Sequence, residues 1–277
     1  MKRPFKTMFL LPAVCLIAVT SLAQQSSTLN LTAEQMEEFL LTAKIGPRKP
    51  IGIGVNDTSS AVLDNGQLQH RAHVAVIDIA KASFQGTQGT EINFKDSWKF
   101  NVAAYELAKL LGFEMVPPSV ERKVAGQDAA LTWWIDDAMM EGDRKAKNVK
   151  APDMLSFNNQ IYAVRVFNQL IYNVDANLTN LLTAKDWNVW MIDHTRAFRL
   201  LKTLENPKNL EKSDRKVLIR MRLLDKPMLT SKLKRWLSSS EIDGLLARRD
   251  KIVAFFDKEI AAKGEDAVLF DLPSRGF

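Results

Sequence analysis

A β-hairpin is predicted within residues 51–81, and it constrains the fold of the amino-terminal half. Apolar and β-branched residues alternate with polar ones on both sides of Asn65 and Gly66. An Asn-Gly pair in this setting is typical of a tight hairpin turn, because both residues accept the left-handed backbone that the turn requires. Two more strands are predicted around Gly126, in SVERKVAGQDAALTWWIDD. The first half of the chain therefore predicts a small sheet.

Helices are predicted before and within this sheet region. A short helix is expected within residues 31–46, where Thr32 is a capping residue and Gln35 follows three positions later. The main helix is expected over residues 96–112, because apolar residues recur there at helical spacing until Gly112.

The carboxyl-terminal half is predicted to be mostly helical. Residues 154–174 carry a wide apolar stripe that is typical of a core helix. Two further helices are expected over residues 210–224 and 241–263, the second after the serines at 238–240 and before Gly264. The fold class is therefore α+β, with two unlike halves.

The first 23 residues predict a signal peptide. Three basic residues precede the uncharged apolar run MFLLPAVCLIAV, and Ser21 and Ala23 occupy the small positions before a cleavage site. The run is shorter than the about 20 residues that span a bilayer, although an uncleaved membrane anchor stays open. The only cysteine, Cys15, lies in this run. We therefore expect an exported chain, periplasmic or extracellular, without cysteine catalysis or a thiolate metal site.

The charge of the chain favours no nucleic-acid partner. The net charge of +6 includes three basic residues of the predicted signal peptide, and without them 35 basic residues face 32 acidic ones. Basic clusters at 141–150 and 232–236 would attract phosphates or an anionic membrane surface. They lack interleaved aromatic residues and any nucleic-acid motif, so a solvated surface is the favoured interpretation.

Three polar side chains in the segment 172–194 are predicted to converge. The sequence NLLTAKDWNVWMID predicts a hairpin, with Asp175 and Asn180 before it and Asp193 at its end. Because a hairpin returns the chain to where it started, Asp193 is expected near Asn180.

The chemistry of these three residues favours phosphoryl transfer. Amide and carboxylate oxygens suit Mg²⁺, which is usually held by one or two protein groups together with substrate phosphates, so Asn180 and Asp193 are the candidate metal ligands. Asp175 is then free to orient a hydroxyl nucleophile or accept its proton, with ATP and Mg²⁺ as the expected cofactors. Taken singly, each residue has the alternative role of a turn residue or a strand-end cap.

These segments resemble a known fold. NVDANLTN (173–180) and IDH (192–194) resemble the catalytic loop and the metal-binding aspartate of the protein-kinase-like fold, in the atypical branch of the phosphoinositide kinases and the HipA-like kinases. VAAYELAKLLGFEMVPPSVER (102–122) resembles the amino-lobe helix and following strand of that branch. The resemblance implies a two-lobed fold, with a mostly-β amino lobe with one main helix over 24–136 and a mostly helical carboxyl lobe over 137–277.

The resemblance also implies a phosphate-binding lysine and a glycine-rich approach to the phosphates. Lys81, at the end of VAVIDIAK, is the candidate lysine, with Lys95 and Lys99 as alternatives. Gly52 and Gly54 would let the backbone approach a phosphate. The three histidines (His70, His73 and His194) lack metal-ligand spacing and are expected to be structural. Trp133 or Trp134 is a candidate for stacking on a purine.

Two departures from the resemblance bear on activity. The family glutamate that pairs with the strand lysine is replaced by Asn101, and the loop Arg and His are replaced by Ala176 and Asn177. Three hypotheses therefore stay open: an exported atypical kinase that transfers the γ-phosphoryl group of ATP to a hydroxyl of a protein, lipid or small molecule; a catalytically inactive pseudokinase-like binding module; and, more weakly, a protein that binds anionic surfaces through residues 232–235.

Overall fold

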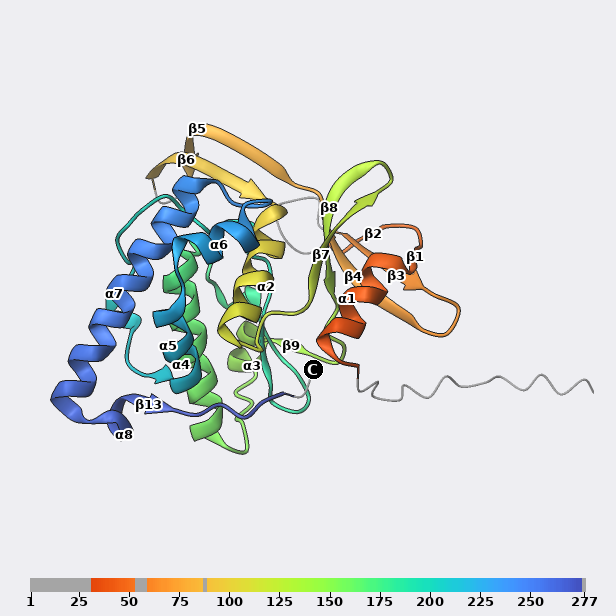
Figure 1. Ribbon diagram of the computed structural model, residues 1–277. Helices are drawn as coiled ribbons and strands as arrows, with labels where there is room; N and C mark the ends of the chain where they lie inside the picture. Colours follow the sequence, from red (N-terminus) through yellow and green to blue (C-terminus); the bar gives the residue numbers. More distant parts are fainter. Residues whose placement is uncertain (1–30, 53–58, 87–88, 276–277) are drawn as a thin grey trace, which may run out of the picture. The chain divides into compact units, whose positions relative to one another are not determined.

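A computed structural model of the chain describes residues 31–52, 59–86 and 89–275 (Figure 1). The predicted signal peptide, Cys15 and Gly54 lie outside these residues. In the described ranges, the helices are all too short or too polar to cross a membrane.

The amino lobe is built on an antiparallel six-stranded sheet. Its order is β1-β3-β4-β8-β7, and β2 pairs with β3 on the outer side. The strands are β1 (Lys44–Ile45), β2 (Lys49–Pro50), β3 (Ser59–Asp64), β4 (Gln69–Ala75), β7 (Ser119–Val124) and β8 (Gln127–Trp133). The predicted turn at Asn65 and Gly66 joins β3 to β4, and Gly126, with a φ of 84°, joins β7 to β8. Both predicted hairpins are therefore confirmed.

Helix α1 (Ala33–Thr42) covers one face of the sheet. Its capping box is the predicted one, since Thr32 Oγ1 accepts from the Gln35 backbone and Gln35 Oε1 accepts from the Thr32 backbone. Phe39 and Leu40 pack there in one core cluster with the side chains of β4 that face α1. This cluster is the core of the amino lobe.

Helix α2 (Lys99–Leu111) joins the sheet to the rest of the chain. It ends where the sequence predicts, at Gly112, which has the left-handed φ of 60°. Near its start, Val102 packs with Trp98, Ala75 and Ala130 against the sheet. The remainder of the helix belongs to the large core of the carboxyl lobe.

The hairpin of β5 (Asp78–Gly86) and β6 (Gly89–Ser97) forms a separate two-stranded sheet. The prediction of a strand that runs through VAVIDIAK to Lys81 is wrong, because β4 ends at Ala75 and a new strand starts at Asp78. The side chains of β5 are mostly exposed on both faces, so no alternation of burial marks this strand in the sequence. Figure 1 shows the hairpin beside α7, where Lys95 Nζ lies 2.6 Å from Glu241 Oε1.

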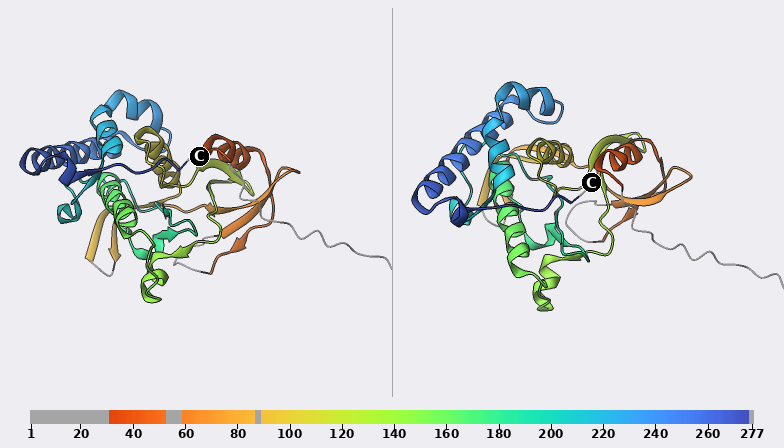
Figure 2. Two further views of the ribbon diagram at one scale, coloured as in Figure 1. Left: turned by 90° about the horizontal axis from the view of Figure 1, so that it is seen from below. Right: turned by 60° about the horizontal axis from the view of Figure 1, so that its bottom comes forward.

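The carboxyl lobe is mostly helical, as Figures 1 and 2 show. Its helices are α3 (Glu141–Ala146), α4 (Met154–Ile171), α5 (Arg215–Leu223), α6 (Lys226–Leu233), α7 (Ser239–Lys263) and α8 (Glu265–Val268). Short strands accompany them: β9 (Met139–Met140), β10 (Leu181–Thr183), β11 (Val189–Met191), β12 (Ser213–Asp214) and β13 (Leu269–Phe270). The 3₁₀ turns are η1 (Leu178–Asn180) and η2 (Pro207–Asn209).

The helix expected over residues 210–224 is shorter, and α6 was not predicted. Asp214 caps α5 by accepting from the Val217 backbone, so α5 starts only after it. Asp225 starts α6 by accepting from the backbone of Met228, and Pro227 fits the first turn because it needs no amide hydrogen there. A sheet lobe and a helical lobe thus make up the expected two-lobed α+β fold.

Candidate functional site

The loop after α4 is shaped by asparagine side chains. Tyr172 ends the helix in the left-handed conformation, with a φ of 47°. The side chain of buried Asn173 donates to Asn168 Oδ1 at 3.2 Å and accepts from the Asp175 backbone at 3.1 Å. The loop that carries Asp175 therefore has a fixed direction when it leaves the helix.

Asn180 contacts Asp175 directly. Its Nδ2 donates to the Asp175 carbonyl at 2.9 Å and lies 3.3 Å from Asp175 Oδ2. Asn177 donates to the other carboxylate oxygen at 3.1 Å and also caps the η1 turn that contains Asn180. Because the Nδ2 atom of Asn180 donates to Asp175, the Oδ1 atom of the same side chain is the one that could bind a cation.

The predicted hairpin forms and brings Asp193 back beside Asn180. Leu181 pairs with Met191, and the Ile192 backbone donates to the Asn180 carbonyl at 3.0 Å. Asp193 follows in the left-handed region, with a φ of 54°, and its Oδ1 accepts from the Thr195 hydroxyl at 3.0 Å. The structure therefore joins Asp175 to Asn180 through their side chains, and it places Asp193 next to Ile192, the residue bonded to the Asn180 backbone.

The donor set at this place fits a hard divalent cation only in part. Among the described residues, no group of three or more His, Cys, Asp or Glu side chains forms a metal site. Asp193 and the Asn180 amide supply two hard oxygen ligands, and Mg²⁺ usually completes its coordination with waters and substrate phosphates. The arrangement thus suits a cation that arrives with a nucleotide, and the ligand roles of Asn180 and Asp193 stay predictions.

Asn101 connects α2 to the segment after Asp193. Its Oδ1 accepts from the His194 backbone at 2.7 Å, and both side chains are buried. Asn101 Nδ2 is buried and has no hydrogen-bond partner among the residues that the structure describes. Burial lowers the pKa of His194 to about 4, so its imidazole is neutral at physiological pH. A neutral hydrogen bond therefore joins the helix to this loop at the position where the resemblance implies an ion pair.

The candidate lysines lie elsewhere. Lys81 is exposed on β5, outside the larger sheet, with its ammonium 5.4 Å from the centre of the Phe84 ring. Lys95 pairs with Glu241 at 2.6 Å, and Lys99 pairs with Asp78 at 2.7 Å. The structure thus does not bring Lys81 together with Asp175, Asn180 and Asp193.

The glycines are only partly covered by the structure. Gly52 has a φ of 69°, and no atom of the described residues lies within 4 Å of the position that a Cβ atom would take there. Its left-handed backbone requires glycine or a strained residue, while the open space shows no close partner. Gly54 lies outside the described residues, so a phosphate-binding role for the two glycines stays a prediction.

The residues between the lobes hold the two tryptophans. Trp133 is buried and stacks on His70, with ring centres 3.7 Å apart. The Arg71 guanidinium lies 3.9 Å from the centre of the Trp134 ring. The Trp134 amide donates to the Arg71 carbonyl at 3.2 Å, and its carbonyl contacts His70 Nε2 at 3.0 Å. Trp133 therefore packs in the core, and purine stacking on Trp134 stays a prediction.

His73 lies within electrostatic range of Asp193, which the sequence analysis did not predict. It lies on β4, and Asp193 is the charged group that raises its pKa, while burial has the larger, lowering effect. The sequence showed only which face His73 occupies, because side chains alternate along a strand and His73 lies between the apolar residues Ala72 and Val74. That Asp193 lies opposite this face required the fold.

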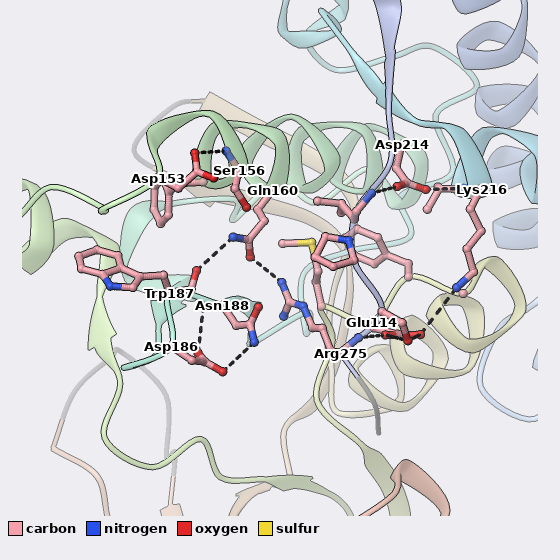
Figure 3. Close-up of a pocket in the computed structure, with 18 of the residues that line it drawn as sticks. Glu114, Asp153, Ser156, Gln160, Asp186, Trp187, Asn188, Asp214, Lys216 and Arg275 are labelled. Carbon is pink, nitrogen blue, oxygen red and sulfur yellow. Dashed lines mark hydrogen bonds and ion pairs between the residues drawn. The ribbon is translucent and has the colours of Figure 1, made fainter. Parts of the chain in front are cut away.

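A cavity that the described residues line lies apart from Asp175, Asn180 and Asp193, none of which borders it (Figure 3). It measures about 270 Å³ and is bordered by α4, the turn between β10 and β11, the start of α5, and the segment 272–275. Arg275 from that segment donates to the Val189 carbonyl at 2.8 Å and to Gln160 Oε1 at 2.7 Å. A smaller cavity of about 40 Å³ is lined by residues of the loop after α4 and of β11, among them Asn173, Asn180 and Met191.

No family model matches this sequence, and no curated protein matches it. Solved structures match its fold. A crystal structure of the Golgi casein kinase has a TM-score of 0.59 at 11% identity, covering 87% of this chain and 80% of that one. A second crystal structure of the Golgi casein kinase, with Mn/ADP bound, has a TM-score of 0.57 at the same identity and coverage. The Helicobacter pylori proinflammatory kinase CtkA matches at a TM-score of 0.44 and 11% identity, over 77% of this chain and 92% of that one. The two matches to the Golgi casein kinase show that the fold of this chain is an atypical protein-kinase-like fold.

Proposed function

We propose that this protein is an atypical kinase that transfers the γ-phosphoryl group of ATP to a hydroxyl group of a protein, a lipid or a small molecule. One observation carries the proposal. Asn180 bonds to Asp175 through its side chain and, through its carbonyl, to the backbone of Ile192, the residue before Asp193.

Each of the three residues has a proposed role. Asp175 orients the hydroxyl nucleophile and accepts its proton, and the Asn177 and Asn180 amides fix the direction of its carboxylate. Asn180 and Asp193 hold Mg²⁺, which neutralises charge on the phosphates when it is bound. Support for these cofactors comes from the similar fold of the Golgi casein kinase, one structure of which has Mn/ADP bound.

Thermal unfolding with ATP, in the presence and absence of Mg²⁺, tests the proposal. A ligand that binds only the folded state raises the unfolding temperature, and a concentration of 100 times Kd stabilises by about 2.7 kcal/mol. We expect a Mg²⁺-dependent rise that is lost in Asp193→Ala. Asp175→Asn should keep the rise but abolish phosphate transfer from ATP to water or to an acceptor. A chain that shows no rise with any purine nucleotide and cation contradicts the proposal.

A pseudokinase-like binding module is the second candidate function. Asn101 supports it, because this residue cannot form the ion pair of active kinases with a strand lysine. Ala176 also removes a loop cation that would steady the phosphoryl group. Under this alternative, nucleotide binding persists in Asp193→Ala, and the wild-type chain transfers no phosphate.

Binding to an anionic surface has less support. Arg235 forms two contacts with Glu121, at 2.5 and 2.9 Å, and the Trp236 indole donates to the same carboxylate. The acid compensates the charge of this arginine, which leaves Lys232 and Lys234 as the basic residues of the segment.

We also propose that the chain is exported. Amino-terminal sequencing of the chain from its native host would test cleavage after residue 23.

A further inference from the structure

His73 points to the same side of the sheet as α2. Its neighbours Ala72 and Val74 are fully buried against α1 on the other face, so alternation along β4 places His73 opposite α1. Two residues further along the same face, Ala75 packs against Trp98 and Val102. In the other direction, Arg71 covers the Trp134 ring. His73 therefore lies between the residues that link the lobes and the start of α2.

A row of polar side chains crosses the sheet at His73. The strand register pairs His73 with Ser60 on β3 and with Thr132 on β8, and it pairs Thr132 with Ser119 on β7. Residues paired in this way point to the same face. The Ser119 and Thr132 hydroxyls form a hydrogen bond of 2.7 Å with each other. A histidine with hydroxyls on both sides is unusual in the middle of a sheet whose other face is an apolar core.

The segment that carries Asp193 is tied to the end of β4. The Trp98 amide donates to the carbonyl of Ile77, just after β4, at 2.7 Å, and the Ser97 amide donates to the Thr195 carbonyl at 2.9 Å. These two hydrogen bonds connect the residues just before α2 to the end of β4 on one side and to the loop after Asp193 on the other. The effect of the Asp193 carboxylate on the pKa of His73 agrees with this placement.

We propose that the imidazole of His73 donates a hydrogen bond to a phosphate oxygen of the bound nucleotide, in the place where other kinases use a strand lysine. The inference rests on the proposed function, since it assigns a residue to the phosphates of the same nucleotide. The Ser60 and Thr132 hydroxyls on either side of His73 offer further donors to those oxygens.

An imidazole can donate a hydrogen bond without carrying a charge, as the side-chain amide of Asn101 can. A lysine on this strand is normally balanced by the glutamate of the helix, and a lysine without that glutamate would leave a half-buried cation facing Asp193 alone. Replacing both members by neutral donors removes one positive and one negative charge together. The Asn101 Nδ2 atom is buried and has no hydrogen-bond partner in the described part of the chain, so it is a second neutral donor on the helix side. The two departures from the kinase pattern thus compensate each other.

The affinities of ADP and adenosine for the full chain, measured by calorimetry with Mn²⁺ present, test this inference. A hydrogen bond to a charged group contributes about 1.5 to 3 kcal/mol, so we expect His73→Ala to weaken ADP binding by about 10-fold or more and adenosine binding by less than about 2-fold. His73→Gln, which keeps an N–H donor at similar size, should retain most of the ADP affinity. His73→Lys should bind ADP at least as tightly as the wild type.

His70→Gln is the matched control, because His70 lies on the same strand with the opposite parity. This variant should leave the ratio of ADP to adenosine affinity unchanged, even if both affinities fall. If His73→Ala also leaves that ratio unchanged while the wild type binds ADP, the role of His73 is wrong and the proposed function stands. If the folded wild-type chain binds no ADP with Mn²⁺ or Mg²⁺, both proposals fall.

Discussion

At the scale of single residues, the Asn101 side chain makes a long-range hydrogen bond. Its Oδ1 accepts from the backbone amide of His194, 93 residues later in the chain, in a buried bond of 2.7 Å. We expect Asn101→Ala to leave that buried N–H without an acceptor, which costs about 1 to 3 kcal/mol of unfolding free energy. Urea unfolding measures the loss, and hydrogen exchange at the His194 amide should accelerate.

The exposed Asn158 on α4 gives a control for this substitution. Asn158→Ala should change the unfolding free energy by less than about 0.5 kcal/mol, as is usual for exposed positions. Unchanged exchange at His194 in Asn101→Ala would show that the bond does not hold the loop after Asp193.

Because of His70, we expect the free energy of unfolding to fall in mild acid. Burial lowers its pKa, and this effect outweighs the raising effect of Asp136, while Arg71 also lowers it. The unfolded chain therefore binds a proton more readily than the folded one, and stability falls as the pH drops below about 6.5, the ordinary histidine value. Denaturant unfolding at pH 7.5, 6.5 and 5.5 should show a shallower decline in His70→Gln than in the wild type. An equal decline in both would mean that His70 is protonated in the folded state.

At the scale of secondary-structure elements, the carboxyl-terminal segment 271–275 acts as a strap on β11. The Leu272 amide donates to Asp214 at 2.8 Å, and the Arg275 amide donates to Glu114 at 2.6 Å (Figure 3). The Arg275 guanidinium then binds Val189 and Gln160, and burial lowers its pKa to about 10. Because β11 leads directly to Asp193, contacts between this segment and β11 also stabilise the start of the candidate metal-binding segment.

Removing this guanidinium should loosen β11 more than the rest of the chain. We expect Arg275→Ala to cost about 2 kcal/mol, since a charged donor to two buried acceptors is lost. Hydrogen exchange should accelerate at Val189 and Met191, whereas Ser274→Ala, which removes only an exposed contact to Glu114, should leave it unchanged. Equal hydrogen exchange in the two variants would show that the Arg275 side chain does not stabilise β11.

Elements with local signals were predictable from the sequence, and those that depend on distant partners were not. The capping box of Thr32, the Asn65–Gly66 turn and the left-handed Gly112 each act within a few residues, and the structure has all three. The β5–β6 hairpin was missed because its strands carry polar residues on both faces and pair only with each other. The approach of Asp193 to Asn180 was predictable because a hairpin joins them, whereas the approach of Asp193 to His73 depends on the assembly of the whole fold.

At the scale of the whole molecule, α2 is the common element of the two lobes. Val102 packs against the sheet, while Leu107 and Leu111 belong to the core that α4 and α7 build. Arg248 of α7 is fully buried, and its guanidinium donates to the carbonyls of Leu170 and Arg199. Helices far apart in the sequence thus converge on the segments before and after the candidate site. We therefore expect the sheet and the helices to unfold in one cooperative transition.

The β5–β6 hairpin adds a second connection, through charge. Glu91 on β6 lies 2.6 Å from Arg199 Nε and 2.8 Å from Arg196 Nη2, and both arginines follow Asp193 in the chain. Arg199 is buried, so its charge depends on this carboxylate and on the Lys95 carbonyl, which accepts from it at 2.6 Å. Burial lowers the pKa of Arg199, and Glu91 partly offsets this by raising it.

Glu91→Gln should therefore destabilise the chain more than the loss of a surface ion pair. Breaking a fully buried pair costs about 3 to 5 kcal/mol, and because Glu91 is 25% exposed we expect about 2 kcal/mol. The control is Glu211→Gln, which removes the exposed pair with Arg165 and should cost less than about 1 kcal/mol. Urea unfolding of both variants at low and high salt measures the difference, and the cost at Glu91 should persist in salt because the pair is shielded from solvent. Equal costs for the two variants would mean that the hairpin does not brace the segment after Asp193.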